Sequence, residues 1–98
     1  MAYKIVWSAE AEKDLHDIIH YLKENWSVQS AEKFISHTFT QLEQLAEMPS
    51  QARITSNHKI YLYKLDKKNA LFFSIENDNL VVLSIYPYKK DISRSKYY

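Results

Sequence analysis

The chain has 98 residues and contains neither glycine nor cysteine. It therefore holds no Gly-rich phosphate loop, nucleophile elbow, disulfide or cysteine-ligated metal centre. The formal charge of +1 hides a split, because residues 1–50 carry four Lys against eight Asp and Glu (4 − 8 = −4), whereas residues 51–98 carry nine Lys and Arg against four acids (9 − 4 = +5). Such an asymmetry either marks a polar partner or results from acidic helices preceding basic strands.

The composition also predicts the class of protein. With 46% hydrophobic and 26% charged residues, the chain is typical of a globular domain. We expect one domain over residues 1–98, in which residues 87–98 form a basic C-terminal tail. Its apolar runs are too short to span a bilayer and no signal region opens it, so we expect no membrane partner and a cytoplasmic location.

The first half of the chain predicts one strand and two helices. Residues 3–7 form a short β-rich run, and Ser8 is placed to cap a helix that ends near Glu24. Ser27 is placed to cap a second helix, which Pro49 ends. The turn between the two helices is short, so they should form an antiparallel hairpin.

In the second half of the chain, apolar and polar residues alternate with a period of two, which predicts strands. After a polar loop at 49–58, we predict strands over 60–65, 71–76 and 80–86, separated by turns at 66–69 and 77–79. Without glycine, Asn or Asp must supply any left-handed turn position. The order β-α-α-β-β-β predicts an α+β fold with a mainly antiparallel sheet and the helical hairpin packed on one face.

Alternation then assigns the strand side chains to two faces of that sheet. We expect one set to face the helices: Leu71, Phe73, Ile75, Val81, Leu83 and Ile85. The alternate set, which includes Phe72, Val82 and Tyr86, lines a face that no helix remains to cover. An exposed Phe72 ring there would be a partner contact or an edge-strand cover.

One motif points to a metal. His16 and His20 form an HxxxH pair, whose spacing places two potential zinc ligands on one helix face. Zincins carry glutamate after the first histidine, whereas Asp17 stands here, and the pair lies among charged residues. We expect an exposed helix face, with no metal and no cofactor.

Several short strings together resemble the RelE/ParE superfamily of bacterial toxins from type II toxin–antitoxin pairs. They are IVWS (5–8), AEKDL (11–15), HYL (20–22), AEKFI (31–35), LAEMP (45–49) and FSIENDNLVVLSIY (73–86). The resemblance implies two alternative activities. RelE-like members cleave mRNA in the ribosomal A site without a metal, whereas ParE-like members poison DNA gyrase. It also implies a cognate antitoxin that wraps and silences the toxin, in a heterotetramer or beside a toxin homodimer.

Residue by residue, the nuclease pattern is incomplete. Ala70 stands where the resemblance implies an arginine, Tyr86 stands where it implies a basic residue, and Tyr88 corresponds loosely to the C-terminal Tyr or His. The catalytic candidates are thus Tyr88, Lys89 and Lys64, and lysine lacks the bidentate fork of arginine. This departure favours the ParE-like branch. The alternatives are a RelE-like endoribonuclease and, given the weak net charge, a degenerate toxin that only binds antitoxin.

The candidate target- or antitoxin-binding residues lie in the basic half of the chain. Arg53 follows the proline that closes the second helix, as an arginine often does in ParE-like chains. The alternative for Arg53 is an ion pair to the acidic half. Residues 86–90 and the rest of the tail interleave aromatic rings with cations, a pattern that is typical of nucleic-acid binding, since bases stack on rings and lysines meet phosphates. The alternatives are that this segment binds the antitoxin, or that it is a solvated tail after the last strand. The full set is Arg53, Lys64, Phe72, Tyr86, Tyr88, Lys89, Lys90 and Arg94.

Overall fold

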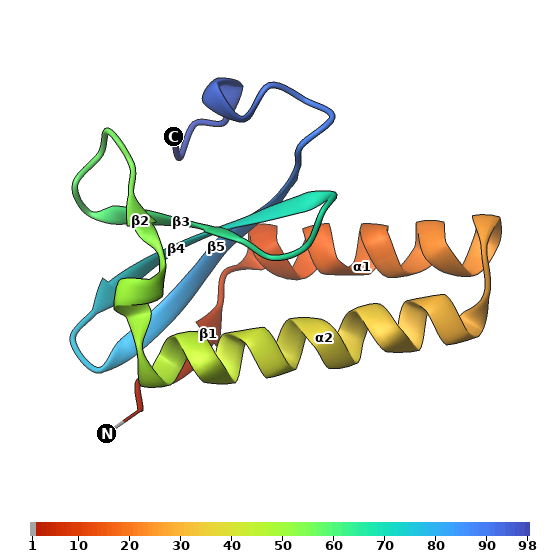
Figure 1. Cartoon of the computed structure of the whole chain (residues 1–98), viewed down its shortest axis with the longest axis horizontal. Coiled ribbons are helices and arrows are strands. Elements are labelled where there is room, and N and C mark those ends of the chain that lie inside the picture. The colour runs from red at the N-terminus through yellow and green to blue at the C-terminus, as the bar shows by residue number, and fades with distance from the viewer. Residues whose placement is uncertain (1) are drawn as a thin grey trace.

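The computed structural model describes residues 2–98, and Figure 1 shows its helices and strands. The elements are β1 (Lys4–Trp7), α1 (Ala9–Asn25), α2 (Val28–Glu47), the 3-10 turn η1 (Pro49–Gln51), β2 (Arg53–Ile54), β3 (Ile60–Lys64), β4 (Asn69–Glu76), β5 (Asn79–Pro87) and the 3-10 turn η2 (Ile92–Arg94). The strands form one sheet in the order β1-β5-β4-β3-β2, antiparallel except where β1 pairs with β5.

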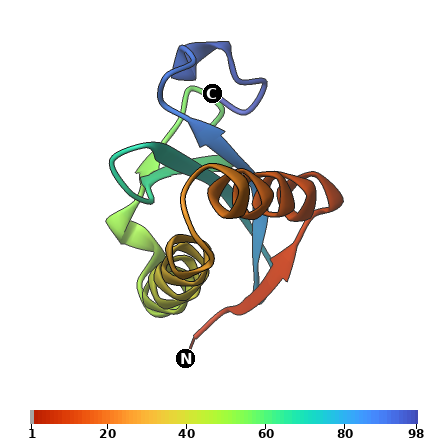
Figure 2. The same ribbon diagram turned by 90° about the vertical axis from the view of Figure 1, so that its right-hand side faces the viewer.

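The helical hairpin packs on one face of this sheet, which we call the helix face (Figure 2). The predicted α+β fold is confirmed, with one strand more than expected. That strand is β2, which lies in the segment predicted to be a loop. No helix within residues 2–98 has the length and apolar character needed to cross a membrane.

The helix boundaries follow from the predicted caps. The Ser8 hydroxyl accepts a hydrogen bond from the amide of Ala11, and the Ser27 hydroxyl accepts one from the amide of Ser30, each at 3.0 Å. Each bond satisfies an amide that has no partner inside its helix. Pro49 opens the 3-10 turn that follows α2, so the helix ends where the proline was predicted to stop it.

The turns without glycine rely on Asn and Asp, as expected. Asn77, between β4 and β5, has φ of 58° and is the only non-glycine residue among residues 2–98 with a positive φ. Asn tolerates this left-handed region better than other side chains. In the β3–β4 turn, Asp66 Oδ1 accepts hydrogen bonds from the amides of Lys68 and Asn69, both at 2.8 Å. This pattern is an Asx turn, which replaces a glycine turn.

The predicted faces of three β5 residues, Val81, Val82 and Leu83, are wrong, and a β-bulge interrupts the strand there. Val81 lies between Leu80 and Val82, which both belong to the helix-face core, so it points to the opposite face. Phe72 lies opposite Ser84 but Phe73 lies opposite Val82, so Leu83 is an extra residue in β5. Val82 is therefore buried in the helix-face core, whereas Leu83 packs against the opposite face. Strict alternation predicted the reverse, because a period of two cannot register a single inserted residue.

Hydrogen bonds from residues at the start of α1 stabilise this bulge. Ser8 donates from its hydroxyl to Leu83 O at 3.1 Å and from its amide to Val82 O at 3.0 Å. One turn later, the half-buried Asp14 accepts from the amide of Ile85 at 3.0 Å and from the hydroxyl of Ser84 at 3.1 Å. The polar groups that the bulge releases from the ladder thus find partners in α1.

The tail, residues 87–98, covers the second face of the sheet, which we call the tail face (Figures 1 and 2). Phe72 is 0% exposed, so the prediction of an uncovered ring was wrong. Its ring contacts Tyr97, with centroids 5.9 Å apart, and Ile92 and Tyr98 pack against the same cluster. The strand alternation could not predict this cover, because the tail is rich in Lys and Tyr. Such side chains indicate a solvated segment, although their apolar parts can be buried.

Polar contacts anchor the end of the tail at two places. The Glu10 carboxylate in α1 accepts from the Tyr97 hydroxyl and pairs with Lys96 Nζ, each at 2.9 Å. The amide and hydroxyl of Ser56 both donate to Tyr98 O, at 3.1 and 2.7 Å. The tail is therefore tied both to the helix hairpin and to the loop after β2.

We expect acid to loosen the tail. The hydrogen bond from Lys96 lowers the pKa of Glu10 below its ordinary 4.5, and the Tyr97 hydroxyl adds to this effect. Since the folded pKa is depressed, the stabilisation is present above pH 4.5 and is lost as the pH falls through the lowered value. NMR signals of the Tyr97 ring, followed from pH 7 to 3, should report this loss.

The control variant is Glu10→Gln, which retains the size of the side chain but not its charge. Its tail should already be looser at pH 7, and the Tyr97 signals should no longer titrate in the acidic range. An identical acid titration of Tyr97 in the wild type and in Glu10→Gln would contradict this assignment.

Candidate functional site

Three predicted site residues meet in one cavity on the tail face. Arg53 from β2, Lys64 from β3 and Tyr88 from the tail all line it. The cavity has a volume of about 320 Å³, and its other lining residues are Gln51, Leu62, Tyr63 and Ile92. We call these seven residues the cationic cavity. They lie far apart in the sequence, and the β2–β3 pairing together with the return of the tail brings them together.

The cavity carries unneutralised positive charge. Within residues 2–98 neither Arg53 nor Lys64 forms an ion pair, and none of the described lining residues is acidic. The alternative that Arg53 pairs with the acidic half is therefore wrong. Two free cations beside a phenol and an amide can receive an anionic group such as a carboxylate or a phosphate.

Tyr88 enters the cavity as a neutral phenol. Burial raises the pKa of its hydroxyl above the ordinary 10.0, while the nearby Arg53 charge acts in the opposite direction and that of Asp66 acts with burial. At neutral pH this hydroxyl is therefore protonated and can donate a hydrogen bond to an anion. It is poorly suited to remove a proton as a phenolate base.

Three positions at which the resemblance to RelE-like nucleases implies catalytic residues are neighbours in the sheet, beside the cavity. Lys64 lies opposite Ala70, and Ala70 lies opposite Tyr86, across β3, β4 and β5. Ala70 is fully buried, and Tyr86 makes an edge contact with Phe72 at 6.4 Å between ring centroids. Lys64 is thus the one cation of these three neighbouring positions.

The remaining predicted residues lie outside the cavity. Lys89, Lys90 and Arg94 are exposed along the tail and are not among its lining residues, and Phe72 is buried beneath the tail. Sequence reasoning did not single out Gln51, Tyr63 or Ile92. Gln51 ends the 3-10 turn η1, just before β2, so no strand alternation in the sequence indicated it as a neighbour of Arg53.

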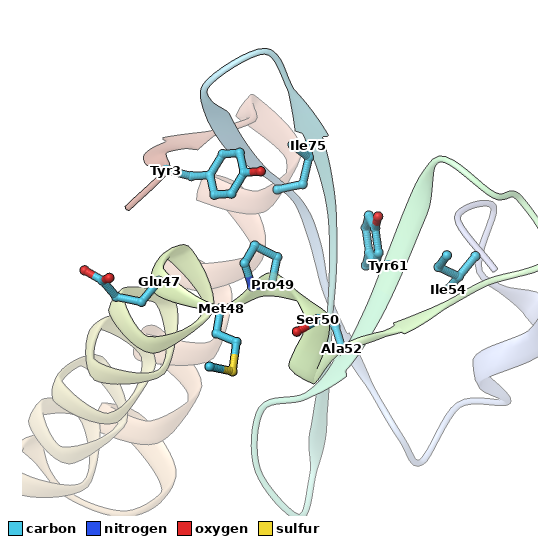
Figure 3. A pocket seen from close by; sticks show the side chains of 9 residues that line it. All are labelled: Tyr3, Glu47, Met48, Pro49, Ser50, Ala52, Ile54, Tyr61 and Ile75. Carbon is cyan, nitrogen blue, oxygen red and sulfur yellow. The ribbon is translucent and has the colours of Figure 1, made fainter. Parts of the chain in front are cut away.

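A second, larger hollow lies on the helix face beside the same strand. Figure 3 shows its lining, which encloses about 700 Å³. It is mostly apolar, and Met48 and Ile54 are 58% and 52% exposed. We call it the apolar groove, and its residues are Tyr3, Glu47, Met48, Pro49, Ser50, Ala52, Ile54, Tyr61 and Ile75.

The HxxxH pair lies on the outer side of α1. His16 and His20 are exposed, and His20 Nε2 lies 3.3 Å from the Glu24 carboxylate. In the part of the chain that the structure describes, no three His, Asp or Glu side chains gather as a metal site. The pair therefore fits a solvated helix face.

Comparisons with known proteins place the chain in a family. The family model described as "ParE toxin of type II toxin-antitoxin system, parDE" matches residues 5–92. A solved structure of the chromosomal ParDE toxin–antitoxin system from P. aeruginosa is similar, with a TM-score of 0.77 and 17% identity over 88% of this chain and 96% of that one. No curated protein matches.

Two further solved structures share the fold. The RelBE2 toxin–antitoxin complex from Mycobacterium tuberculosis has a TM-score of 0.62 and 13% identity, over 89% of this chain and 99% of that one. The YoeB dimer from Staphylococcus aureus has a TM-score of 0.61 and 13% identity, over 88% and 97%. At these identities the likeness is one of fold, two helices on a five-stranded mixed sheet.

Proposed function

The chain belongs to the ParE toxin family of type II toxin–antitoxin systems, and we propose that it inhibits growth by binding DNA gyrase and is neutralised by a cognate antitoxin. The observation that carries the choice of gyrase is the row Lys64, Ala70 and Tyr86, in which two of three positions lack a cation. Solved neighbours that are toxin–antitoxin systems support the antitoxin.

Charge stabilisation explains why this row disfavours RNA cleavage. Attack by a 2′-hydroxyl builds negative charge on a pentacoordinate phosphate, and removing one group that stabilises such charge typically costs about 10²- to 10³-fold in rate. Here Ala70 offers nothing to that charge, and Tyr86 directs its ring against Phe72. Ribosome-dependent mRNA cleavage is nevertheless the second candidate, because Arg53, Lys64 and Tyr88 share one cavity.

The deciding experiment is expression of the chain alone in a bacterial host. We expect growth arrest with gyrase-linked DNA breaks and DNA-damage signalling. Cuts at codons in mRNA would instead favour the nuclease and would overturn the gyrase proposal. Normal growth, combined with tight binding of an antitoxin, would indicate a degenerate toxin that acts only as a binding module.

Two variants of the cationic cavity sharpen this test. Arg53→Glu should weaken growth inhibition by about tenfold or more, which corresponds to about 1.4 kcal/mol of lost binding. Tyr88→Phe should weaken inhibition by no more than about tenfold, because it removes one hydrogen-bond donor, worth about 0.5–1.5 kcal/mol, and transfers no proton. A nuclease that used Tyr88 as an acid or base would lose about 10²- to 10⁴-fold. Titration of inducer against growth rate measures both variants.

Lys33→Glu is the matched control for charge reversal. Lys33 is exposed on α2, away from the cavity, so growth inhibition by this variant should equal that of the wild type. If Arg53→Glu and Lys33→Glu behave alike, the cationic cavity has no part in the activity.

A further inference from the structure

The bend between α1 and α2 carries the most exposed aromatic ring among residues 2–98. Trp26 is 67% exposed, and Tyr21 and Val28 on either side of it are 55% and 54% exposed. Figure 1 shows this bend at the far right, beyond the ends of the strands. Exposed apolar side chains thus gather at a point where the molecule projects from its sheet, and such gatherings mark interaction sites.

Local structure explains why the Trp26 ring is exposed. Trp26 and Ser27 are the two residues between the helices, and they cap the end of α1 and the start of α2. The Trp26 amide donates to Leu22 O at 2.9 Å, a cap that requires no particular side chain. The apolar stripes of both helices face the sheet, so a ring at the bend has no core to enter. The fold alone therefore does not account for a tryptophan at this position.

Free lysines accompany the apolar side chains. Lys68, in the turn between β3 and β4, places its Nζ 5.7 Å from the centroid of the Trp26 ring, which is a cation–π contact. Lys67 in the same turn and Lys23 in the last turn of α1 are also exposed. Within residues 2–98 none of these three lysines forms an ion pair. We call Tyr21, Lys23, Trp26, Val28, Lys67 and Lys68 the hairpin tip.

The acids near the hairpin tip offset this charge only in part. Asp66 accepts hydrogen bonds from the amides of its own turn, and the Glu24 carboxylate lies 3.3 Å from His20 Nε2. Glu32 is exposed one turn into α2. The lysine ammonium groups are therefore available to an anionic partner, although the attraction is smaller than three isolated charges would give.

This combination of groups fits the headgroup region of an anionic lipid bilayer. Trp and Tyr concentrate at that interface because their rings are apolar at one end and polar at the other. Lysines nearby are attracted to the negative surface. A single-stranded nucleic acid also binds rings and lysines, but in a groove that tracks its backbone. Neither the cationic cavity nor the apolar groove includes a residue of the hairpin tip, and the exposed Val28 offers a base nothing to stack on.

We propose that the hairpin tip docks on anionic lipid headgroups, with Trp26 and Val28 at the interface and the lysines against lipid phosphates. Docking of this kind requires no membrane-spanning segment, so the shortness of the apolar runs in the chain does not exclude it. The contact is small, and binding is therefore weak and reversible. The inference does not rest on the proposed function.

Sedimentation with vesicles tests the proposal on the full chain. The vesicles consist of phosphatidylcholine alone, or of phosphatidylcholine and phosphatidylglycerol in equal parts. We expect affinity for the anionic vesicles to be about tenfold or more above that for the neutral ones, since each lysine near an anionic surface contributes about fivefold. Salt at about 1 M should abolish the difference, because it screens charges beyond about 3 Å.

Tryptophan fluorescence locates the contact. The chain has two tryptophans, and Trp7 is half-buried against Phe39. Anionic vesicles should shift the emission to the blue in the wild type and in Trp7→Phe, but not in Trp26→Phe. A shift that requires Trp7 instead would place the contact elsewhere and overturn the proposal.

Variants of the hairpin tip separate its apolar and charged parts. Val28→Asp and Lys68→Glu should each weaken binding to anionic vesicles by about tenfold. Val28→Asp should retain the fold, because acidic residues are favoured in the first turn of a helix. Lys59→Glu is the matched control, since Lys59 is exposed in the loop between β2 and β3, at the opposite end of the molecule in Figure 1. It should bind as the wild type does.

Several results would count against lipid docking. They are equal binding to neutral and anionic vesicles, equal effects of Lys59→Glu and Lys68→Glu, and no sedimentation at millimolar lipid. A single-stranded oligonucleotide that bound through Trp26 while vesicles did not would assign the hairpin tip to nucleic acid and overturn the proposal. The growth assay is independent of these measurements, so failure here leaves the proposed function standing.

Discussion

Phe72→Ala should lower the free energy of unfolding by about 3–5 kcal/mol, the range typical of a fully buried phenylalanine. Phe72 is 0% exposed and lies between the sheet and the tail, where it contacts Tyr86 and Tyr97. Its removal leaves a cavity that the tail alone can fill only in part. Urea unfolding followed by circular dichroism measures the loss.

Phe39→Ala is the matched control for this prediction. Phe39 lies on α2 with 42% of its surface exposed and contacts Trp7 at 6.0 Å between ring centroids. Its loss should cost about 1 kcal/mol, the value of one such aromatic pair. If Phe72→Ala cost no more than Phe39→Ala, the tail would not seal the second face in solution.

The burial of Phe72 also shows where sequence reasoning reached its limit. The caps Ser8 and Ser27, the stop at Pro49 and the turn at Asn77 were predictable, because each depends on chemistry within a few residues. The cover over Phe72 depends on contacts with Tyr97 and Ile92, some twenty residues away. Nothing in the local pattern distinguishes a tail that folds back from one that is solvated.

For the candidate site, too, the residues could be predicted from the sequence but their arrangement could not. Charge and position singled out Arg53, Lys64 and Tyr88, and the structure brings these three together. Their meeting depends on β2, a two-residue strand whose existence follows from pairing with β3 rather than from its own propensity. The apolar groove was not predicted for the same reason, since its lining comes from four separate parts of the chain: residue 3, residues 47–54, residue 61 and residue 75.

Asp14→Ala should destabilise the fold by about 1–3 kcal/mol, the usual cost of leaving a buried donor without its acceptor. The donor is the amide of Ile85, which the bulge at Leu83 directs toward α1. Ser84 loses its partner in the same variant. Amide hydrogen exchange at Ile85 should accelerate more than exchange in α2, because the change opens β5 locally.

Asp14→Asn separates the hydrogen bonds from the charge. The Ile85 amide and the Ser84 hydroxyl both donate to the same oxygen, Asp14 Oδ2, so the side-chain oxygen of asparagine can still accept from both, and we expect a change within about 1 kcal/mol. Burial raises the pKa of Asp14 above its ordinary 3.8, although the two hydrogen bonds oppose this. The charged form is thus disfavoured by folding, and stability falls as the pH rises from 3.8 through the raised value.

Because asparagine carries no charge, Asp14→Asn should lose this part of the pH dependence while retaining the bulge. Unfolding curves at pH 4 and pH 7 measure the difference. Equal destabilisation by Asn and Ala at both pH values would mean that the carboxylate charge, rather than the acceptor, holds β5. That outcome would conflict with the raised pKa, because a charge that stabilised the fold would lower the pKa of its own group.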